Sequence, residues 1–234
     1  MIFGGVILPK IDTVIKLGGS LITQKKIYQK ILNELIILVN LGFKILLIPG
    51  GGILSDHIRT LYKNKKITDE AAHWMAILCM DQMAHLLANN NKKITLINNI
   101  DEGEKVLNEN KLPILLVYNY LKNNDELPHK WDVTSDSISA FIALKLNSSK
   151  LILIKDVDGL YSEDPKLKNN ANFISKIKIS EFNVNKYNIV DAFLPEILKL
   201  FLIKGKCWLV NGIYPKRVNN IIQDINEIHT ELLI

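Results

Sequence analysis

The chain has 234 residues, of which 48% are hydrophobic and 23% are charged, and its formal net charge is +5. This balance is typical of a folded protein with a sizeable core and excludes wholesale disorder. No stretch approaches the roughly 20 uninterrupted apolar residues of a membrane span. The lysines are scattered and not grouped with aromatic residues, which disfavours a nucleic-acid surface. We therefore expect neither a membrane nor a nucleic acid as a partner.

The two cysteines and the first ten residues bear on location. Cys79 and Cys207 lie far apart in apolar runs, which indicates two buried thiols in a reducing cytoplasm and neither a disulfide nor a zinc site. The segment 1–10 is apolar but short, lacks a basic start and contains Pro9, so it does not fit a signal peptide. The sequence favours a cytoplasmic protein.

Apolar runs rich in Ile, Val and Leu alternate with amphipathic stretches. The runs predict buried strands at 13–17, 43–48, 93–97, 114–117, 151–154 and 206–210. The stretches between them predict helices at 25–41, 55–64, 69–89, 103–110, 135–146, 192–204 and 215–232. This alternation predicts an α/β protein, a three-layer αβα sandwich around a mostly parallel open sheet. The polar segment 119–129 is the expected hinge between two halves, 1–130 and 131–234, that share one continuous sheet.

Two predicted strands run directly into glycines before a helix. Lys16, a charge inside an apolar strand, is followed by Gly18, Gly19 and Ser20, and the next strand ends in Gly50, Gly51 and Gly52. Glycines at such a point let backbone N–H groups approach phosphate oxygens, and the helix start favours anions. A buried lysine needs an anionic partner, either a carboxylate or a bound phosphate, unless it extends to the edge of the sheet. Neither segment matches the P-loop or the dinucleotide fingerprint.

A third group of polar residues surrounds the predicted strand 151–154. The strand leads into Lys155, Asp156, Asp158, Gly159 and Tyr161, with Asp164, Pro165 and Lys166 shortly after. Before it, the helix 135–146 opens on Thr134, Ser135 and Asp136. These are helix-capping residue types, so a plain N-cap is the alternative to a functional role.

In the order and spacing of these pieces the chain resembles the amino acid kinase family over essentially its whole length. The resemblance implies ATP and Mg²⁺ as cofactors and an acceptor half followed by an ATP half. It implies that Lys16 contacts the transferring phosphoryl group and that Asp136 orients the active-site lysines. The ATP-binding residues so implied are Gly18, Gly19, Ser20, Thr134, Ser135, Asp156, Gly159, Tyr161, Asp164, Pro165 and Lys166. A homo-oligomer joined through the N-terminal half is also implied, with 31–41 as a candidate surface.

The chain departs from the family pattern at one place. Many members carry a second lysine in a Gly-Gly-Met-rich segment before the last strand, and the corresponding region, 189–196, has no such motif. We expect Lys155 to supply this second positive charge beside the ATP phosphates, so that Lys16, Asp136 and Lys155 form the catalytic group. The alternative is an ion pair of Lys155 with Asp156 or Asp158. The expected chemistry is direct in-line transfer without a phosphoenzyme.

The acceptor-binding residues are expected to be Gly50, Gly51, Gly52, Asp56, Trp74, Asp81 and Trp131. Asp81 and His85 lie four apart in the helix 69–89 and share a stripe with Trp74. This stripe could be part of the acceptor pocket, or equally a satisfied buried pair or a helix–helix contact in an oligomer. No residue is assigned as a protein ligand for a metal.

The segments 72–82 and 131–137 are similar to one branch of the family, the kinases of methanofuran biosynthesis that phosphorylate [5-(aminomethyl)furan-3-yl]methyl phosphate to its diphosphate. The resemblance implies that Trp74 or Trp131 lies against the furan and that Asp56 or Asp81 pairs with the ammonium group. The alternatives are a uridylate or isopentenyl phosphate kinase of the same fold, or a non-catalytic nucleotide-binding protein. Asp56 occupies the position at which isopentenyl phosphate kinases place a histidine, which argues against that acceptor.

Overall fold

A computed structural model describes residues 11–163, 171–183, 187, 189–201, 203 and 205–233. Eight strands form one sheet in the order β3-β4-β2-β1-β5-β9-β10-β8, and β6 pairs with β7 separately. Neighbours from β3 to β9 are parallel, whereas β10 runs antiparallel to β9. The strands are β1 (Thr13–Leu17), β2 (Ile45–Pro49), β3 (Ile94–Ile97), β4 (Leu112–Leu115), β5 (Lys150–Lys155), β6 (Leu160–Tyr161), β7 (Phe173–Ile174), β8 (Lys176–Lys178), β9 (Lys206–Asn211) and β10 (His229–Leu233).

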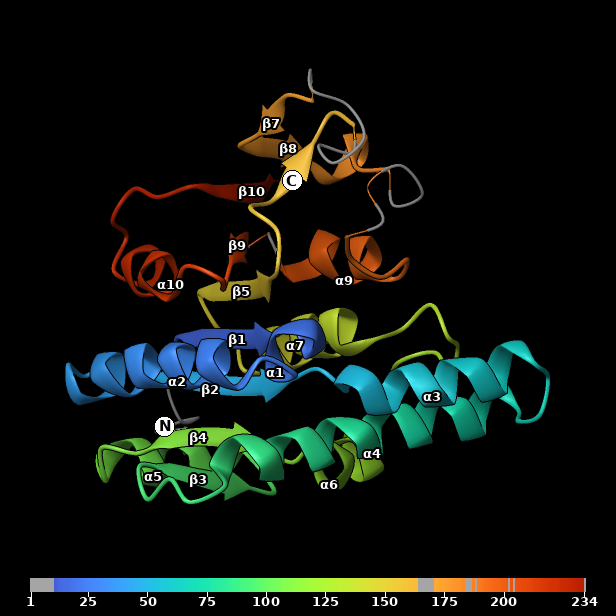
Figure 1. Cartoon of the computed structure of the whole chain (residues 1–234), viewed down its shortest axis with the longest axis horizontal. Helices are drawn as coiled ribbons and strands as arrows, with labels where there is room; N and C mark the ends of the chain where they lie inside the picture. The colour runs from blue at the N-terminus through green and yellow to red at the C-terminus, as the bar shows by residue number, and fades with distance from the viewer. Residues whose placement is uncertain are drawn as a thin grey trace, which may run out of the picture.

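Helices cover the sheet and complete the predicted three-layer αβα sandwich, which is confirmed (Figure 1). Helix α2 packs against α10, α7 packs on β1 and against α9, and α3 runs beside α4. The helices are α1 (Gly19–Ile22), α2 (Lys25–Asn40), α3 (Gly52–Lys63), α4 (Asp69–Ala88), α5 (Gly103–Asn108), α6 (Val117–Asn124), α7 (Ser135–Lys145), α9 (Leu194–Phe201) and α10 (Pro215–Ile222), with 3₁₀ turns η1 (Ile100–Glu102) and η2 (Ile179–Glu181).

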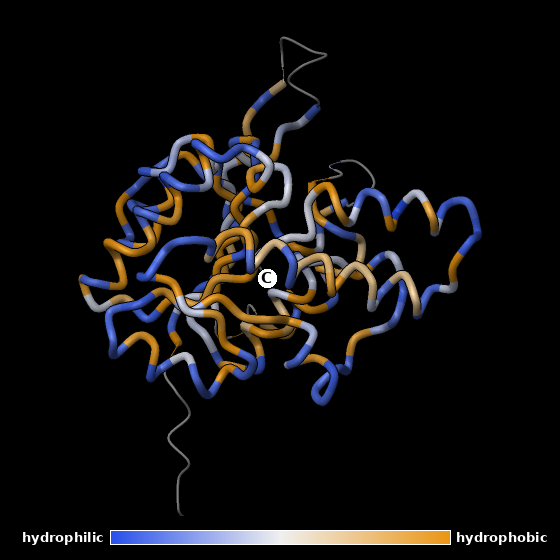
Figure 2. Tube along the Cα trace, turned by 60° about the horizontal axis from the view of Figure 1, so that its bottom comes forward, coloured by the Kyte–Doolittle hydropathy of each residue, from blue (hydrophilic) through white to orange (hydrophobic). Residues whose placement is uncertain are grey.

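The core is built from the sheet and the inward faces of these helices. Every residue of β1, β2 and β4 is buried, as expected of strands covered on both faces. Figure 2 shows the apolar residues gathered toward the centre of the trace and hydrophilic ones around it. In the stretch 31–41 only Ile37 and Leu41 are exposed large hydrophobic residues, because most of the others enter the core. Cys79 and Cys207 are buried and free, as predicted. Among the described residues, no helix has the length and apolar character that crossing a membrane requires.

The sheet order fixes where a ligand can bind. Chain order reverses at β1, which has β2 on one side and β5 on the other. The connection that follows β1 leads to β2 and the chain that follows β5 leads on to β9, in opposite directions along the sheet, which is the arrangement that opens a crevice in parallel sheets. Both glycine segments and the end of β5 meet at this edge.

Three predicted elements are wrong in part. The helix expected over 215–232 ends at Ile222, because Asp224 adopts a positive φ of 59° that no α-helix continues through, and the chain returns as β10. The hinge expected at 119–129 begins inside α6, so only its second part is a loop. The strand expected at 114–117 lies earlier, at Leu112–Leu115, and Val117 already starts α6.

Candidate active site

A cavity of about 820 Å³ opens at the carboxyl ends of β1, β2 and β5. Its size lies within the range of small-molecule sites. Both glycine segments, the start of α7 and the end of β5 line it, and α3, α4 and the loop after α6 form its outer wall. The predicted site residues that line it are Lys16, Gly19, Ser20, Gly50, Gly51, Gly52, Asp56, Trp131, Thr134, Ser135, Asp136 and Lys155.

Lys16, Asp136 and Lys155 form one buried ionic group at the base of the cavity. Nζ of Lys155 donates to Oδ2 of Asp136 at 2.6 Å, and Nζ of Lys16 lies 3.0 Å from Oδ1. Lys16 is paired in register with Leu153 of β5, and Lys155 follows two residues later, so both lysines project from the same face of the sheet. The alternative for Lys155, an ion pair with Asp156 or Asp158, is wrong, because its ion-pair partner is Asp136.

The charges of this group are strongly coupled. Burial alone would raise the pKa of Asp136, but the charges of Lys155 and Lys16 outweigh it and lower the pKa to about 2. Burial lowers the pKa of Lys155 from its usual value, against the opposing attraction of Asp136. Two ammonium groups therefore share one carboxylate, and an excess positive charge faces the cavity. Oδ1 of Asp136 is buried and accepts no hydrogen bond from the residues described, although Lys16 is its ion-pair partner.

The two glycine segments touch each other. A Cβ on Gly19 would lie 2.4 Å from the backbone N of Gly52, so neither backbone could approach the other if Gly19 carried a side chain. Gly52 itself has a positive φ of 56°, which favours glycine. The N–H of Gly50 donates to the carbonyl of Leu17 at 2.8 Å and ties the second segment to the end of β1. The cavity is thus bounded by bare backbone from two strands.

The start of α7 is held by Asp191, which precedes α9. Its carboxylate accepts from the Thr134 N–H (3.0 Å) and hydroxyl (2.8 Å), from the Ser137 N–H (2.9 Å) and hydroxyl, and from the Leu194 N–H (2.8 Å). Burial, and then the charge of Asp136, raise the pKa of Asp191. One carboxylate therefore caps α7 and α9 together and sets the position of Asp136. The Thr134 side chain also accepts from the Asp136 N–H, so Thr134 has the capping role that its residue type allows.

Cations dominate the outer wall of the cavity. Arg59, Lys63 and Lys130 line it in addition to the two buried lysines. Asp56, on the exposed surface of α3, forms an ion pair with Arg59. Trp131 stacks on Tyr62 with ring centroids 5.3 Å apart, and the Arg59 guanidinium lies 5.7 Å from the Trp131 ring. This side of the cavity offers positive charge, an aromatic face and one carboxylate.

The structure places Trp74 and Asp81 elsewhere and corrects their assignment to the acceptor pocket. The Asp81 carboxylate accepts from the N–H groups of Val117 (2.6 Å) and Tyr118 (3.3 Å), so it caps α6. Burial raises its pKa to about 6, although those hydrogen bonds and the charge of His85 oppose the rise. Trp74 packs edge-on against Tyr118 and does not line the cavity. Asp81 and Trp74 on α4 therefore contact α6 within the same chain, a role that the sequence alternatives did not include.

The residues after β5 form a second polar cluster. Asp158 accepts from Asn211 (2.8 Å) and from the Arg217 guanidinium (2.6 Å), and the Tyr161 hydroxyl lies 3.5 Å from it. Gly159 has a φ of 146°, and a Cβ there would meet the Thr230 hydroxyl at 2.3 Å, so this position requires glycine. Asp156 is exposed. Of the predicted ATP-binding residues, Asp164, Pro165 and Lys166 lie outside the described residues.

Sequence reasoning missed four residues of the site. Asp191 was not assigned a role because its five donors come from segments far apart in the chain. Arg59, Lys63 and Lys130 lie in ordinary surface patterns, where a basic residue is usually solvated. The spacing of Arg59 and Lys63 offered one signal, because residues four apart on a helix share a face.

An open α/β sheet with two glycine segments at its switch point, and two lysines directed at one cavity, defines a protein that binds and transfers anionic groups. The chain belongs to the amino acid kinase family, whose sequence model matches residues 13–200. It is therefore a phosphotransferase, and the predicted family and fold are confirmed.

Individual relatives agree with this assignment. The chain is 32% identical over 224 residues to the [5-(aminomethyl)furan-3-yl]methyl phosphate kinase of Methanocaldococcus jannaschii, covering 94% of this chain and 97% of that one. It is 23% identical to the uridylate kinase of Methanococcus vannielii, covering 83% and 91%. Among solved structures, the uridylate kinase of Archaeoglobus fulgidus superimposes with a TM-score of 0.72 at 17% identity, covering 94% and 99%.

Proposed function

We propose that this kinase transfers the γ-phosphoryl group of ATP to the phosphate of [5-(aminomethyl)furan-3-yl]methyl phosphate, giving the diphosphate and ADP, a step of methanofuran biosynthesis. The observation that carries the proposal is the composition of the cavity: buried Lys16 and Lys155 at its base, glycine backbone at its side, and Arg59 and Lys130 on its outer wall. The 32% identity to the Methanocaldococcus jannaschii kinase supports the choice of acceptor.

The proposed reaction is a direct displacement. An oxygen of the acceptor phosphate forms a bond to the γ-phosphorus while the bond from that phosphorus to the ADP oxygen breaks. Such a transfer needs little covalent help, so the protein acts by positioning and by neutralising charge. Lys16 and Lys155 would neutralise the equatorial oxygens, and Asp136 would hold both lysines at the cavity base without attacking any atom. The amide groups of Gly19 and Ser20 would bind phosphate oxygens.

The donor groups of the cavity fit Mg²⁺ carried by the nucleotide better than an ion held by the protein alone. Each acidic group lining it is engaged: Asp136 by two lysines, Asp191 by five donors, and Asp56 by Arg59. Mg²⁺ is commonly bound through substrate phosphates and retained waters. When bound, the ion would neutralise charge on the ATP phosphates. Among the chain's own residues, the lysines would neutralise phosphate charge.

The proposed acceptor matches the outer wall group by group. Its phosphate would lie among Gly50–Gly52, Arg59 and Lys130, and its ring against Trp131. Asp56 would take the ammonium group, in exchange for part of its pairing with Arg59. A carboxylate facing an otherwise anionic acceptor is unfavourable unless the acceptor also carries a cation, and this acceptor does.

The test is ³¹P NMR of the purified chain with Mg·ATP and a panel of acceptors: the furan phosphate, UMP, isopentenyl phosphate and N-acetylglutamate. We expect a new diphosphate signal with the furan phosphate alone. Turnover of UMP in its place would reject the acceptor and keep the kinase chemistry. If no acceptor is turned over while ATP still binds, the proposed reaction is wrong and the chain is a nucleotide-binding protein.

The ammonium contact has its own test. Asp56→Asn is expected to raise the KM for the furan phosphate about tenfold, with kcat within about twofold, because one charge-assisted hydrogen bond is lost. With an acceptor analogue that lacks the amino group, the same substitution should change nothing. An equal effect on both acceptors would remove Asp56 from ammonium recognition.

A further inference from the structure

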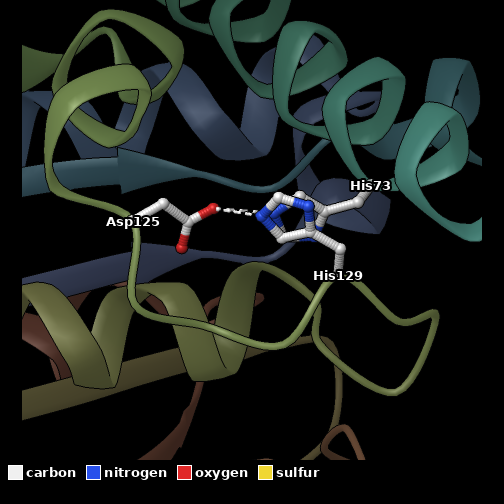
Figure 3. A group of neighbouring side chains, drawn as sticks. All are labelled: His73, Asp125 and His129. Atoms are coloured by element: carbon white, nitrogen blue, oxygen red, sulfur yellow. Dashed lines mark hydrogen bonds and ion pairs between the residues drawn. The ribbon is translucent and has the colours of Figure 1, made fainter.

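Three side chains of metal-ligating type converge beside the cavity, on the described part of the chain. His73 lies on α4, Asp125 follows the last residue of α6, and His129 lies four residues further along (Figure 3). Nε2 of each histidine lies 3.1 Å from the same atom, Oδ2 of Asp125. One ligand atom from each residue falls within 4.8 Å of the others. None of the three takes part in the chemistry proposed above.

The group is held rigidly by its surroundings. Oδ1 of Asp125 accepts from the Leu127 N–H at 2.9 Å, which aims Oδ2 at the two rings. The imidazoles stack 4.4 Å apart at 15°, and Trp74 packs edge-on against both. The His73 side chain is 1% exposed and that of Asp125 is 7%, whereas His129 is 34% exposed. The three donor atoms thus lie close together before any ligand arrives, with access from solvent on the His129 side.

Two imidazole nitrogens and one carboxylate oxygen are a donor set for Zn²⁺ and similar ions. Bonds of 2.0–2.2 Å in tetrahedral geometry place neighbouring donor atoms about 3.3 Å apart. The two nitrogen–oxygen distances here, 3.1 Å each, are close to that spacing. Imidazole donors favour zinc, copper, nickel and iron, whereas magnesium and calcium prefer oxygen alone. Three protein ligands leave the fourth position for water.

We propose that His73, Asp125 and His129 bind one divalent transition-metal ion of the zinc class. The ion would fasten the loop that follows α6 to the second turn of α4. That loop continues directly into Lys130 and Trp131, which line the cavity. The metal therefore acts as a positioning device for the outer wall of the cavity and touches no reacting atom. The proposal rests on the geometry of these three residues, and it stands or falls independently of which acceptor is phosphorylated.

The competing arrangement is a purely hydrogen-bonded clamp, in which both imidazoles donate to Asp125 and no ion enters. The two arrangements differ in a direct measurement. Chelator-treated protein is titrated with Co²⁺, whose visible absorption reports tetrahedral nitrogen and oxygen ligands, and with Zn²⁺ by calorimetry. We expect one equivalent of either ion per chain, with Zn²⁺ displacing Co²⁺.

His129→Asn is the principal variant, because this residue is partly exposed and its loss need not disturb the core. Asp125→Asn is the second, and His57→Asn, an exposed histidine on α3, is the matched control. Removing even an outer partner of a ligand costs 10–100-fold in affinity, so we expect each site variant to bind Zn²⁺ at least about 100-fold more weakly. Zn²⁺ should raise Tm for the wild type and the control, but not for the site variants. Absence of saturable binding to the wild type, or undiminished binding by both variants, would overturn the site and leave the hydrogen-bonded clamp.

Discussion

Lys16 and Lys155 reach one carboxylate from neighbouring parallel strands, and each contacts a different oxygen of Asp136. The arrangement follows from strand register, which puts both lysines on one face of the sheet at different depths along it. Because the carboxylate is fully committed to the lysines, it fixes where their charges lie before any phosphate arrives. Preorganised charge of this kind needs no rearrangement during the reaction.

Lys155→Met is expected to lower kcat about 100- to 1000-fold, the cost of removing one preorganised donor to a developing charge. Asp136 keeps Lys16 as a partner, so the variant should still fold. The matched control is Lys150→Met at the other end of β5, where the lysine pairs with Asp224. Steady-state kinetics with saturating Mg·ATP make the comparison. A kcat for Lys155→Met equal to that of the control would remove this lysine from the mechanism.

Asp136→Asn is expected to destabilise the fold by about 3–5 kcal/mol, because two buried ammonium groups lose their counter-charge. Urea unfolding measures the loss. Adding Lys155→Met to this variant should restore part of the stability, since one uncompensated charge is then removed. If the two substitutions simply add, the proposed charge coupling is wrong.

We expect the Asp136 carboxylate to make the free energy of unfolding fall at acid pH. The pKa of Asp136 in the folded chain is about 2, below its usual value near 4 in unfolded chains. Its contribution is therefore fully present above about pH 4 and is lost as the pH falls toward 2. The difference in unfolding free energy between the wild type and Asp136→Asn should shrink over this range. A difference that stays constant from pH 5 to pH 2 would contradict the lowered pKa.

Asp191→Asn is expected to cost about 2 kcal/mol or more, because buried N–H and hydroxyl donors lose their charged acceptor. It should also lower kcat, since the start of α7 carries Asp136. Glu196→Gln is the control, because Glu196 forms an exposed ion pair with Lys199, and such pairs contribute under about 1 kcal/mol. Equal effects of the two substitutions would show that Asp191 does not organise the helix starts.

Asp81→Asn tests a pH dependence of stability that is opposite in sign to that of Asp136. The pKa of Asp81 is raised to about 6, so its contribution to stability is fully present below about pH 4 and is lost as the pH rises through 6. The variant should therefore gain stability relative to the wild type between pH 4 and pH 7. Asp101→Asn, at an exposed position, serves as the control in the same urea titrations. A constant difference across this range would contradict the raised pKa.

The strands of this fold could be predicted because each is an apolar run long enough to be buried on both faces. Their order in the sheet could not, since pairing between β1 and β5 joins residues more than a hundred positions apart. The antiparallel β10 was missed because Ile225 and Ile228 continue the apolar spacing of a helix beyond its actual end. The helix ends before Asp224, which adopts a positive φ. Aspartate tolerates this angle but does not require it, so the sequence does not predict the turn.

The parts of the site that could be predicted are those that a local sequence pattern indicates. A lysine inside an apolar strand and glycines at two strand ends identified the cavity base. The role of Asp81 was wrong because helical spacing shows which residues share a face and not what that face meets. Asp191 and the cations of the outer wall depend on contacts between distant segments, which no local spacing reports.

The contact between Gly19 and Gly52 limits how this protein can change. The Gly52 backbone occupies the space that a methyl group on Gly19 would need, whereas Gly52 is restricted by its own positive φ. A substitution at Gly19 therefore cannot be repaired by its own neighbours in sequence, because the obstacle follows a different strand. On the proposed acceptor wall, by contrast, side chains of α3 and of the loop after α6 line the cavity, and we expect new acceptor specificities to arise there. The base of the cavity and its outer wall can thus change in sequence at different rates.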